Sequence, residues 1–155
     1  MSDNQKTLNS SIEFTGVGLH TGEGVHMVIE PAKINHGVKF QRIDLENQPI
    51  LPADINLVTD TQRSTTLEKD NVKIVTVEHL MSALYALGVN NVLIKMDRSE
   101  VPILDGSAKC FVEEIQKVGL KVQDAPLKYI DLPDPIHYTD PDSGSEILFV
   151  PTNNF

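Results

Sequence analysis

The sequence predicts an α+β fold, in which two helices pack on one face of a mostly antiparallel sheet. In the first half of the 155 residues, short segments alternate apolar and polar side chains, as half-buried strands do. The second half contains two segments with helical spacing, at about 77–87 and 107–118, separated by a short apolar strand. A row of strands followed by helix, strand and helix is typical of an α+β arrangement.

Period-two alternation defines the strands of the first half. Between residues 24 and 30, for example, Val25, Met27 and Ile29 share one face. A turn at residues 35–37 opens the third strand, and the polar loop at residues 68–71 suits a hairpin between its flanking strands. The expected strands span residues 11–15, 24–30, 37–45, 64–67 and 72–75, with a buried strand at 91–96 between the helices.

The first predicted helix runs from about Val77 to Gly88. Thr76 stands at its N-cap, where a hydroxyl can accept a backbone N–H of the first turn, and Gly88 suits a left-handed terminator. A second helix starts near Ser107 and ends at Gly119. The apolar stripes expected to face the core are Val77, Leu80, Met81, Leu84 and Leu87 in the first helix, and Ala108, Phe111, Val112, Ile115 and Val118 in the second.

The composition shifts near residues 121–126, and we interpret this segment as a linker. Beyond it, residues 127–138 and 145–150 are predicted to form two strands joined by a turn rich in Asp, Pro, Ser and Gly. One hairpin is too small to be a stable domain. We therefore expect a first domain at residues 1–125, followed in 126–155 by a linker and the first hairpin of a truncated second domain.

Composition and charge exclude several classes of partner. The formal net charge of −9 and the isoelectric point near 4.9 argue against nucleic acid. No apolar run is long enough to span a bilayer, so no stable membrane insertion is expected. Because the N-terminus is polar, no signal peptide is expected, and the single cysteine, Cys110, is expected to be a buried, reduced thiol. These features favour a cytoplasmic setting.

Glu78 and His79 place a carboxylate and an imidazole side by side in the first turn of the first helix. At about 100° per residue, both fall away from the apolar stripe. A His that can bind a metal beside a Glu that can move a proton recurs in metal-assisted hydrolysis. The alternative is structural, because Glu suits the first turn of any helix and a lone His is usually a surface residue.

The glycine-rich segment from Gly16 to Gly24 resembles a phosphate-binding loop. Its third glycine comes one residue late for that motif, and a strand follows it where the motif needs a helix. The glycines instead suit a sharp turn between two strands, which leaves His20 exposed as a candidate functional residue. His26 and Glu30 lie roughly 13 Å apart on a strand, too far to share one metal.

Three motifs in register carry a resemblance to a known family. They are Gly16–Gly22, Thr76–Leu80 and Pro102–Ser107, and the similarity runs from about residue 8 to Phe155. In these motifs, their order and their spacing, the chain resembles the amino-terminal part of the zinc-dependent UDP-3-O-acyl-N-acetylglucosamine deacetylases of lipid A biosynthesis.

The resemblance implies an enzyme with two similar α+β domains that clamp the active site between them. It implies that His79 binds Zn²⁺ and that Glu78 is the general base. The other ligands, a His-x3-Asp pair, and a His that protonates the leaving amine would lie in a carboxy-terminal domain of the same polypeptide beyond Phe155. The fragment alone is then expected to be inactive.

The substrate that the resemblance implies is a UDP-linked acylated aminosugar, from which acetate is removed. Leu19 and His20 align with a turn near the active site, and the loop at 60–65, to which Ser64 belongs, aligns with a segment that borders the substrate in relatives. Asp105 matches a motif residue, but its place between a strand and a helix suits turn and capping work equally well.

A non-catalytic α+β module that binds a ligand or a protein is the competing hypothesis. Fold alone does not fix function, and the chain holds one candidate zinc ligand where catalytic sites usually have three. The sequence after Phe155 separates the two: a His-x3-Asp pair and a later His favour the enzyme.

Overall fold

The computed structural model describes residues 4–130 and 132–152. Its centre is a five-stranded sheet in which neighbouring strands are antiparallel, except for the parallel pair β9 and β4. The strands in order across the sheet are β2 (Ile12–Val17), β3 (Gly24–Pro31), β9 (Val92–Met96), β4 (Val38–Arg42) and β5 (Ile50–Pro52). The predicted α+β class is confirmed.

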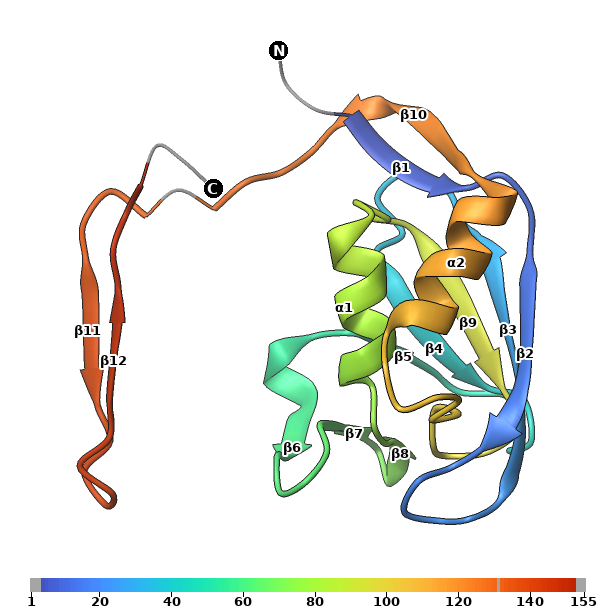
Figure 1. The fold of residues 1–155 in the computed structure, drawn as a ribbon, viewed down its shortest axis with the longest axis horizontal. Helices are drawn as coiled ribbons and strands as arrows, with labels where there is room; N and C mark the ends of the chain where they lie inside the picture. Colours follow the sequence, from blue (N-terminus) through green and yellow to red (C-terminus); the bar gives the residue numbers. More distant parts are fainter. Residues whose placement is uncertain (1–3, 131, 153–155) are drawn as a thin grey trace.

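Helices α1 (Glu78–Ala86) and α2 (Lys109–Val118) lie side by side on one face of this sheet (Figure 1). The sheet presents a matching apolar row, because Ile29 and Phe40 both pair in register with Ile94 of the strand between them. On the helix side, Phe111 of α2 packs edge-to-face on Phe14 of β2, with ring centroids 5.0 Å apart. The start of α1 belongs to the same core, since Val77 and Leu80 are buried in it.

A second, three-stranded sheet lies beside α1 in the described part of the chain (Figure 1). It contains β6 (Val58–Asp60), β7 (Thr66–Lys69) and β8 (Val72–Ile74), and it follows the short 3-10 helix η1 (Ile55–Leu57). The hairpin predicted across residues 68–71 is confirmed as β7 and β8. Its outgoing end leads directly into α1.

The expected linker at residues 121–126 is wrong, because this segment is strand β10 (Leu120–Pro126). It pairs antiparallel with β1 (Asn4–Leu8), a strand that the sequence analysis missed. The ribbon is joined to the main sheet by a buried amide, since Asn91 Nδ2 donates to both Gln5 Oε1 (2.8 Å) and Gln123 Oε1 (2.7 Å). The two strands lie more than a hundred residues apart in sequence, so local pattern carried no sign of their pairing.

Thr76 is not the N-cap that the sequence predicted. The cap position is Val77, which makes no side-chain capping bond, and Thr76 is buried with a left-handed φ of 59°. The predicted helix ends are confirmed, since Gly88 and Gly119 follow the helices with φ of 69° and 73°. Cys110 also departs from expectation, because it is half-buried rather than buried.

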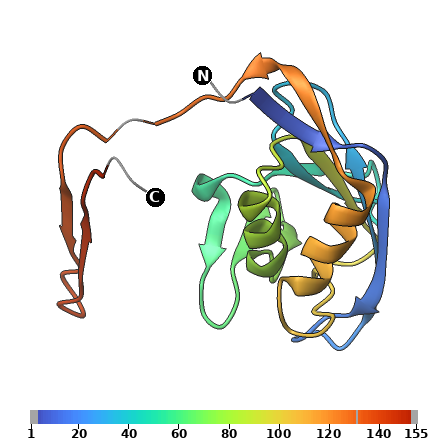
Figure 2. The same ribbon diagram turned by 45° about the horizontal axis from the view of Figure 1, so that its top comes forward.

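The last described residues form a hairpin of β11 (Ile136–Thr139) and β12 (Glu146–Phe149), as expected, although the first strand is shorter than residues 127–138. The hairpin extends away from the helices and the five-stranded sheet (Figures 1 and 2). Its apolar side chains are exposed, among them Ile147, Leu148 and Phe149. Neither helix of the described residues is long or apolar enough to cross a membrane.

Candidate active site

Glu78 and His79 are the first two residues of α1, and both are half-buried beside the buried Val77 and Leu80. The Glu78 carboxylate accepts a hydrogen bond from the Thr65 backbone N–H, with 2.9 Å between Oε2 and N. This bond ties the start of α1 to the loop that enters β7. It leaves Oε1 of Glu78 without a partner among the described residues and able to accept a proton from a water molecule.

His79 presents an uncommitted imidazole. Its ring nitrogens have no hydrogen-bond partner in residues 4–130 and 132–152, and the nearby Ser82 hydroxyl donates to the His79 carbonyl oxygen instead (2.8 Å). A neutral imidazole with a free nitrogen is the commonest protein ligand for zinc-like metals. One imidazole is not a complete site, however, and the described residues contain no group of three His, Cys, Asp or Glu that could hold a metal.

His20 and Ser64 come together although 44 positions separate them. Both line a polar pocket of about 520 Å³ between the β2–β3 loop and the small sheet. The other residues that line it are Thr59, Asp60, Gln62, Arg63, Thr66, Glu68, Lys73 and Val75. Leu19, the neighbour of His20, is 58% exposed and does not line this pocket.

Glu78 borders a different, mostly apolar pocket of about 360 Å³ on the other side of the β7 entry. The apolar side chains in its wall include Ile55, Leu67, Val77 and Met81. The backbone of Thr65 links the two pockets, since it follows Ser64 and donates to Glu78. A larger cavity of about 860 Å³, beside β1 and β10, contains none of the expected site residues.

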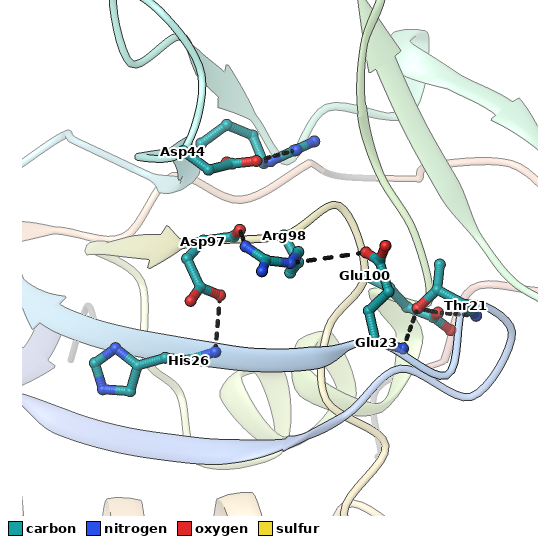
Figure 3. Close-up of polar contacts among 8 residues, drawn as sticks. Thr21, Glu23, His26, Asp44, Asp97, Arg98 and Glu100 are labelled. Carbon is teal, nitrogen blue, oxygen red and sulfur yellow. Dashed lines mark hydrogen bonds and ion pairs between the residues drawn. The ribbon is translucent and has the colours of Figure 1, made fainter.

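Glu100 is a buried carboxylate close to the polar pocket that His20 lines. It was not among the site residues predicted from the sequence. It accepts hydrogen bonds from the backbone N–H groups of His20 (3.0 Å) and Thr21 (2.8 Å), and from the hydroxyls of Thr21 (2.8 Å) and Thr76 (2.9 Å). Figure 3 shows the contact between Thr21 and Glu100, beside the ion pair of Arg98 with Glu23. These donors lie in two segments that are distant from Glu100 in the sequence. The residues around Glu100 therefore gave no indication of its hydrogen bonds.

Burial alone would raise the pKa of Glu100, but its hydrogen bonds from His20, Thr21 and Thr76 outweigh that effect and hold the pKa below its ordinary value. The carboxylate is therefore ionised and acts only as an acceptor. The loop it holds depends on glycine at one position, because a Cβ on Gly18 would collide with Thr21 Oγ1 and the Glu100 carboxylate.

Asp105 serves its own turn. Its Oδ1 accepts from the Ser107 backbone N–H (3.0 Å) and hydroxyl (2.9 Å), and the Ser107 hydroxyl accepts from the Lys109 N–H at the start of α2 (3.1 Å). The bond from the Ser107 N–H lowers the pKa of Asp105. These contacts support a structural role of Asp105 in the turn before α2, whose N-cap residue Ala108 makes no side-chain capping bond.

Comparison with known proteins assigns the chain to a family. A model of the UDP-3-O-acyl N-acetylglycosamine deacetylases (LpxC) matches residues 5–155. The chain belongs to the LpxC family. Membership confirms the resemblance drawn from the three motifs.

Individual LpxC relatives match nearly the whole chain. A bifunctional enzyme LpxC/FabZ of Bacteroides thetaiotaomicron is 48% identical over 97% of this chain and 33% of its own length. UDP-3-O-acyl-N-acetylglucosamine deacetylases of Chromohalobacter salexigens and Stenotrophomonas maltophilia are each 45% identical, over 97% and 89% of this chain. The matches cover 49% and 46% of those two proteins, so the chain spans between a third and a half of these relatives.

Proposed function

We propose that this chain supplies the general base and one zinc ligand of a deacetylase that removes acetate from UDP-3-O-acyl-N-acetylglucosamine, a step of lipid A biosynthesis. The observation that carries the proposal is the start of α1. There Glu78 keeps one carboxylate oxygen available, and His79 keeps an uncommitted ring, in a chain of the LpxC family. The family name supports the reaction and the substrate class.

The chemistry assigned to Glu78 is general-base catalysis. A bound Zn²⁺ would polarise the acetamide carbonyl and acidify a water molecule. Glu78 takes a proton from the attacking water through Oε1, while the Thr65 N–H holds Oε2 and so fixes the direction of the carboxylate. Water adds to the carbonyl carbon, the C–N bond breaks as a His of the carboxy-terminal domain donates a proton to the leaving nitrogen, and acetate and the amine of the sugar are released.

Substrate contacts are assigned to the polar pocket and its rim. His20 and Ser64 both line the pocket, and Leu19 is the exposed residue that precedes His20 in the chain. A pocket of about 520 Å³ is within the size range of small-molecule sites. We assign Leu19, His20 and Ser64 to binding of the UDP-linked sugar.

The remaining half of the reaction centre is proposed to come from a carboxy-terminal domain of the same polypeptide. Residues 1–125 are the first domain in this proposal, and 126–155 contain the first hairpin of the second. The exposed apolar side chains of β11 and β12 support this, because a second domain would cover them. The added domain completes the Zn²⁺ ligand set around His79, and the reaction is placed in the cytoplasm.

The test uses a family-length protein, defined as this chain joined to the remaining part of the Chromohalobacter salexigens relative. Glu78→Gln should keep bound zinc and lower turnover by about 10²–10⁴-fold, the usual contribution of a general base. His79→Ala should lower the zinc content as well as the turnover. Glu46→Gln, at an exposed position, is the matched control and should change neither. Full turnover in Glu78→Gln would overturn the proposal.

A further inference from the structure

Three segments of the chain meet at the Glu100 side chain, which is only 1% exposed. The β2–β3 loop contributes the backbone N–H groups of His20 and Thr21. The segment that leads into α1 contributes the hydroxyl of Thr76. The backbone of Glu100 is held in place, since the N–H of Val101 donates to the Val75 carbonyl oxygen (3.0 Å) and Val75 and Glu100 form a parallel bridge. The carboxylate therefore connects the loop of His20 with the entry to α1.

The division of donors between the two oxygens makes Glu100 a bridge. Oε1 accepts from the His20 N–H (3.0 Å) and from the Thr76 hydroxyl (2.9 Å), so one atom contacts both segments. Oε2 accepts from the Thr21 N–H and hydroxyl, each at 2.8 Å, and shares the His20 N–H at a longer distance of 3.2 Å. Hydrogen bonds to a charged acceptor are roughly twice as strong as neutral ones. A carboxylate suits this place because all four partners are donors.

The β2–β3 loop has few other polar ties to the rest of the molecule. Its bonds from the Gly18 N–H to Glu23 and from the Gly22 N–H to Gly18 are internal to the loop. The ion pair of Glu23 with Arg98 is long, at 3.8 Å, and its side chains are about half exposed. An exposed pair of this kind contributes little. Glu100 is thus the main polar anchor of the loop in the described structure.

We propose that Glu100 is a positioning residue, which fixes the loop of His20 against the start of α1 that carries Glu78 and His79. It acts through the backbone of His20 and through Thr76, and it does not contact the substrate. Its consequence for catalysis rests on the proposed function. The competing explanation is that Glu100 only stabilises the fold.

Amide hydrogen exchange on the 155-residue chain tests the anchor without any reference to activity. In Glu100→Gln an N–H group replaces one acceptor oxygen, so the amides of His20 and Thr21 should exchange at least about ten-fold faster. The amides of Ile29 and Ile94 in the central sheet should keep their rates. Unchanged exchange at His20 and Thr21 would overturn the proposal.

A second set of variants applies if Glu100→Gln does not fold. Thr21 is exposed, so Thr21→Val removes one donor to Glu100 at little cost to the core, and Thr21→Ser keeps that donor. The His20 amide should exchange faster in Thr21→Val than in Thr21→Ser. Thr15→Val, at an exposed strand position, is the control for the chemical change itself. Equal exchange in the two Thr21 variants would contradict the anchor.

A double-mutant cycle in the family-length protein tests the consequence for catalysis. If Glu100 acts by placing His20, then Glu100→Gln and His20→Ala should each lower kcat/KM, but their fold-reductions should not multiply in the double variant. The kcat/KM of the double variant should match that of His20→Ala within about three-fold. Multiplying effects would mean that Glu100 acts through stability alone. A failure of the proposed function would be recognised separately, because Glu78→Gln would then retain turnover. The exchange experiment would still decide whether Glu100 anchors the loop.

Discussion

At the scale of single residues, two carboxylates near the candidate active site have opposite environments. Glu78 is half-buried and receives one N–H, from Thr65, whereas Glu100 is buried and receives donors from three residues. An anchored carboxylate with a free oxygen suits proton transfer, and a carboxylate saturated with donors suits a fixed structural position. The two residues should therefore respond differently to mutation.

Acid should destabilise the protein partly through Glu100. Its pKa lies below the ordinary value of 4.5 because its hydrogen bonds outweigh the effect of burial. A lowered pKa gives stability that is present above the unfolded pKa and is lost as the pH falls through the folded pKa. Urea unfolding at pH 7 and at lower pH should show a larger acid loss in the natural chain than in Glu100→Gln. Equal losses would contradict the assignment.

Gly18→Ala should destabilise the β2–β3 loop. The new Cβ would collide with Thr21 Oγ1 and with the Glu100 carboxylate, which could move away only by giving up its hydrogen bonds to the loop and to Thr76. We expect a loss of about 1–3 kcal/mol in the free energy of unfolding, as for other overpacked sites. Gly24→Ala is the matched control, because a Cβ there meets nothing within 4 Å. A neutral result for Gly18→Ala would show that the loop relaxes.

At the scale of elements, local patterns predicted those strands and helices whose partners or signals lie nearby. Alternation placed β2 and β3, and glycines placed both helix ends at Gly88 and Gly119. The failures involve distant partners: β10 pairs with β1, and Thr76 bonds to Glu100 instead of capping α1. The same limit applies to the site, where His20 was singled out on its loop but the carboxylate that holds it was not.

The ribbon of β1 and β10 should depend on Asn91. This buried side chain accepts from the Gly37 N–H (2.8 Å) and donates to Gln5 and Gln123, so Asn91→Ala removes the hydrogen bonds that join the ribbon to the central sheet. A loss of about 1–3 kcal/mol in unfolding free energy is expected. In Asn91→Ala the amide hydrogen-exchange rates should rise most in β1 and β10. Gln116→Ala, on the exposed side of α2, is the control. Uniform exchange changes across all strands would contradict this local role.

At the scale of the whole molecule, the core of the sheet and two helices is separate from the terminal hairpin. The buried apolar side chains come from residues 8–115, and β11 and β12 pair with each other. Figures 1 and 2 show the hairpin at a distance from both helices. The apolar groups of the hairpin therefore add nothing to the described core.

Removal of residues 127–155 should leave the core folded. Because β10 ends at Pro126, the truncated chain keeps the β1–β10 ribbon and all of the buried apolar cluster. The melting temperature should change by less than about 3 °C, which is under 1 kcal/mol for a domain of this size. Thermal unfolding followed by circular dichroism measures it. A large fall in the melting temperature would show that the hairpin packs on the core in solution.

Deacetylation by the 155-residue chain, assayed with added zinc beside the family-length protein, tests the central claim that Glu78 and His79 are one half of a divided reaction centre. The account predicts turnover of UDP-3-O-acyl-N-acetylglucosamine by the family-length protein and none by the chain alone, because the described residues offer no set of three metal ligands. Acetate release by the chain alone, at a rate near that of the longer protein, would contradict it.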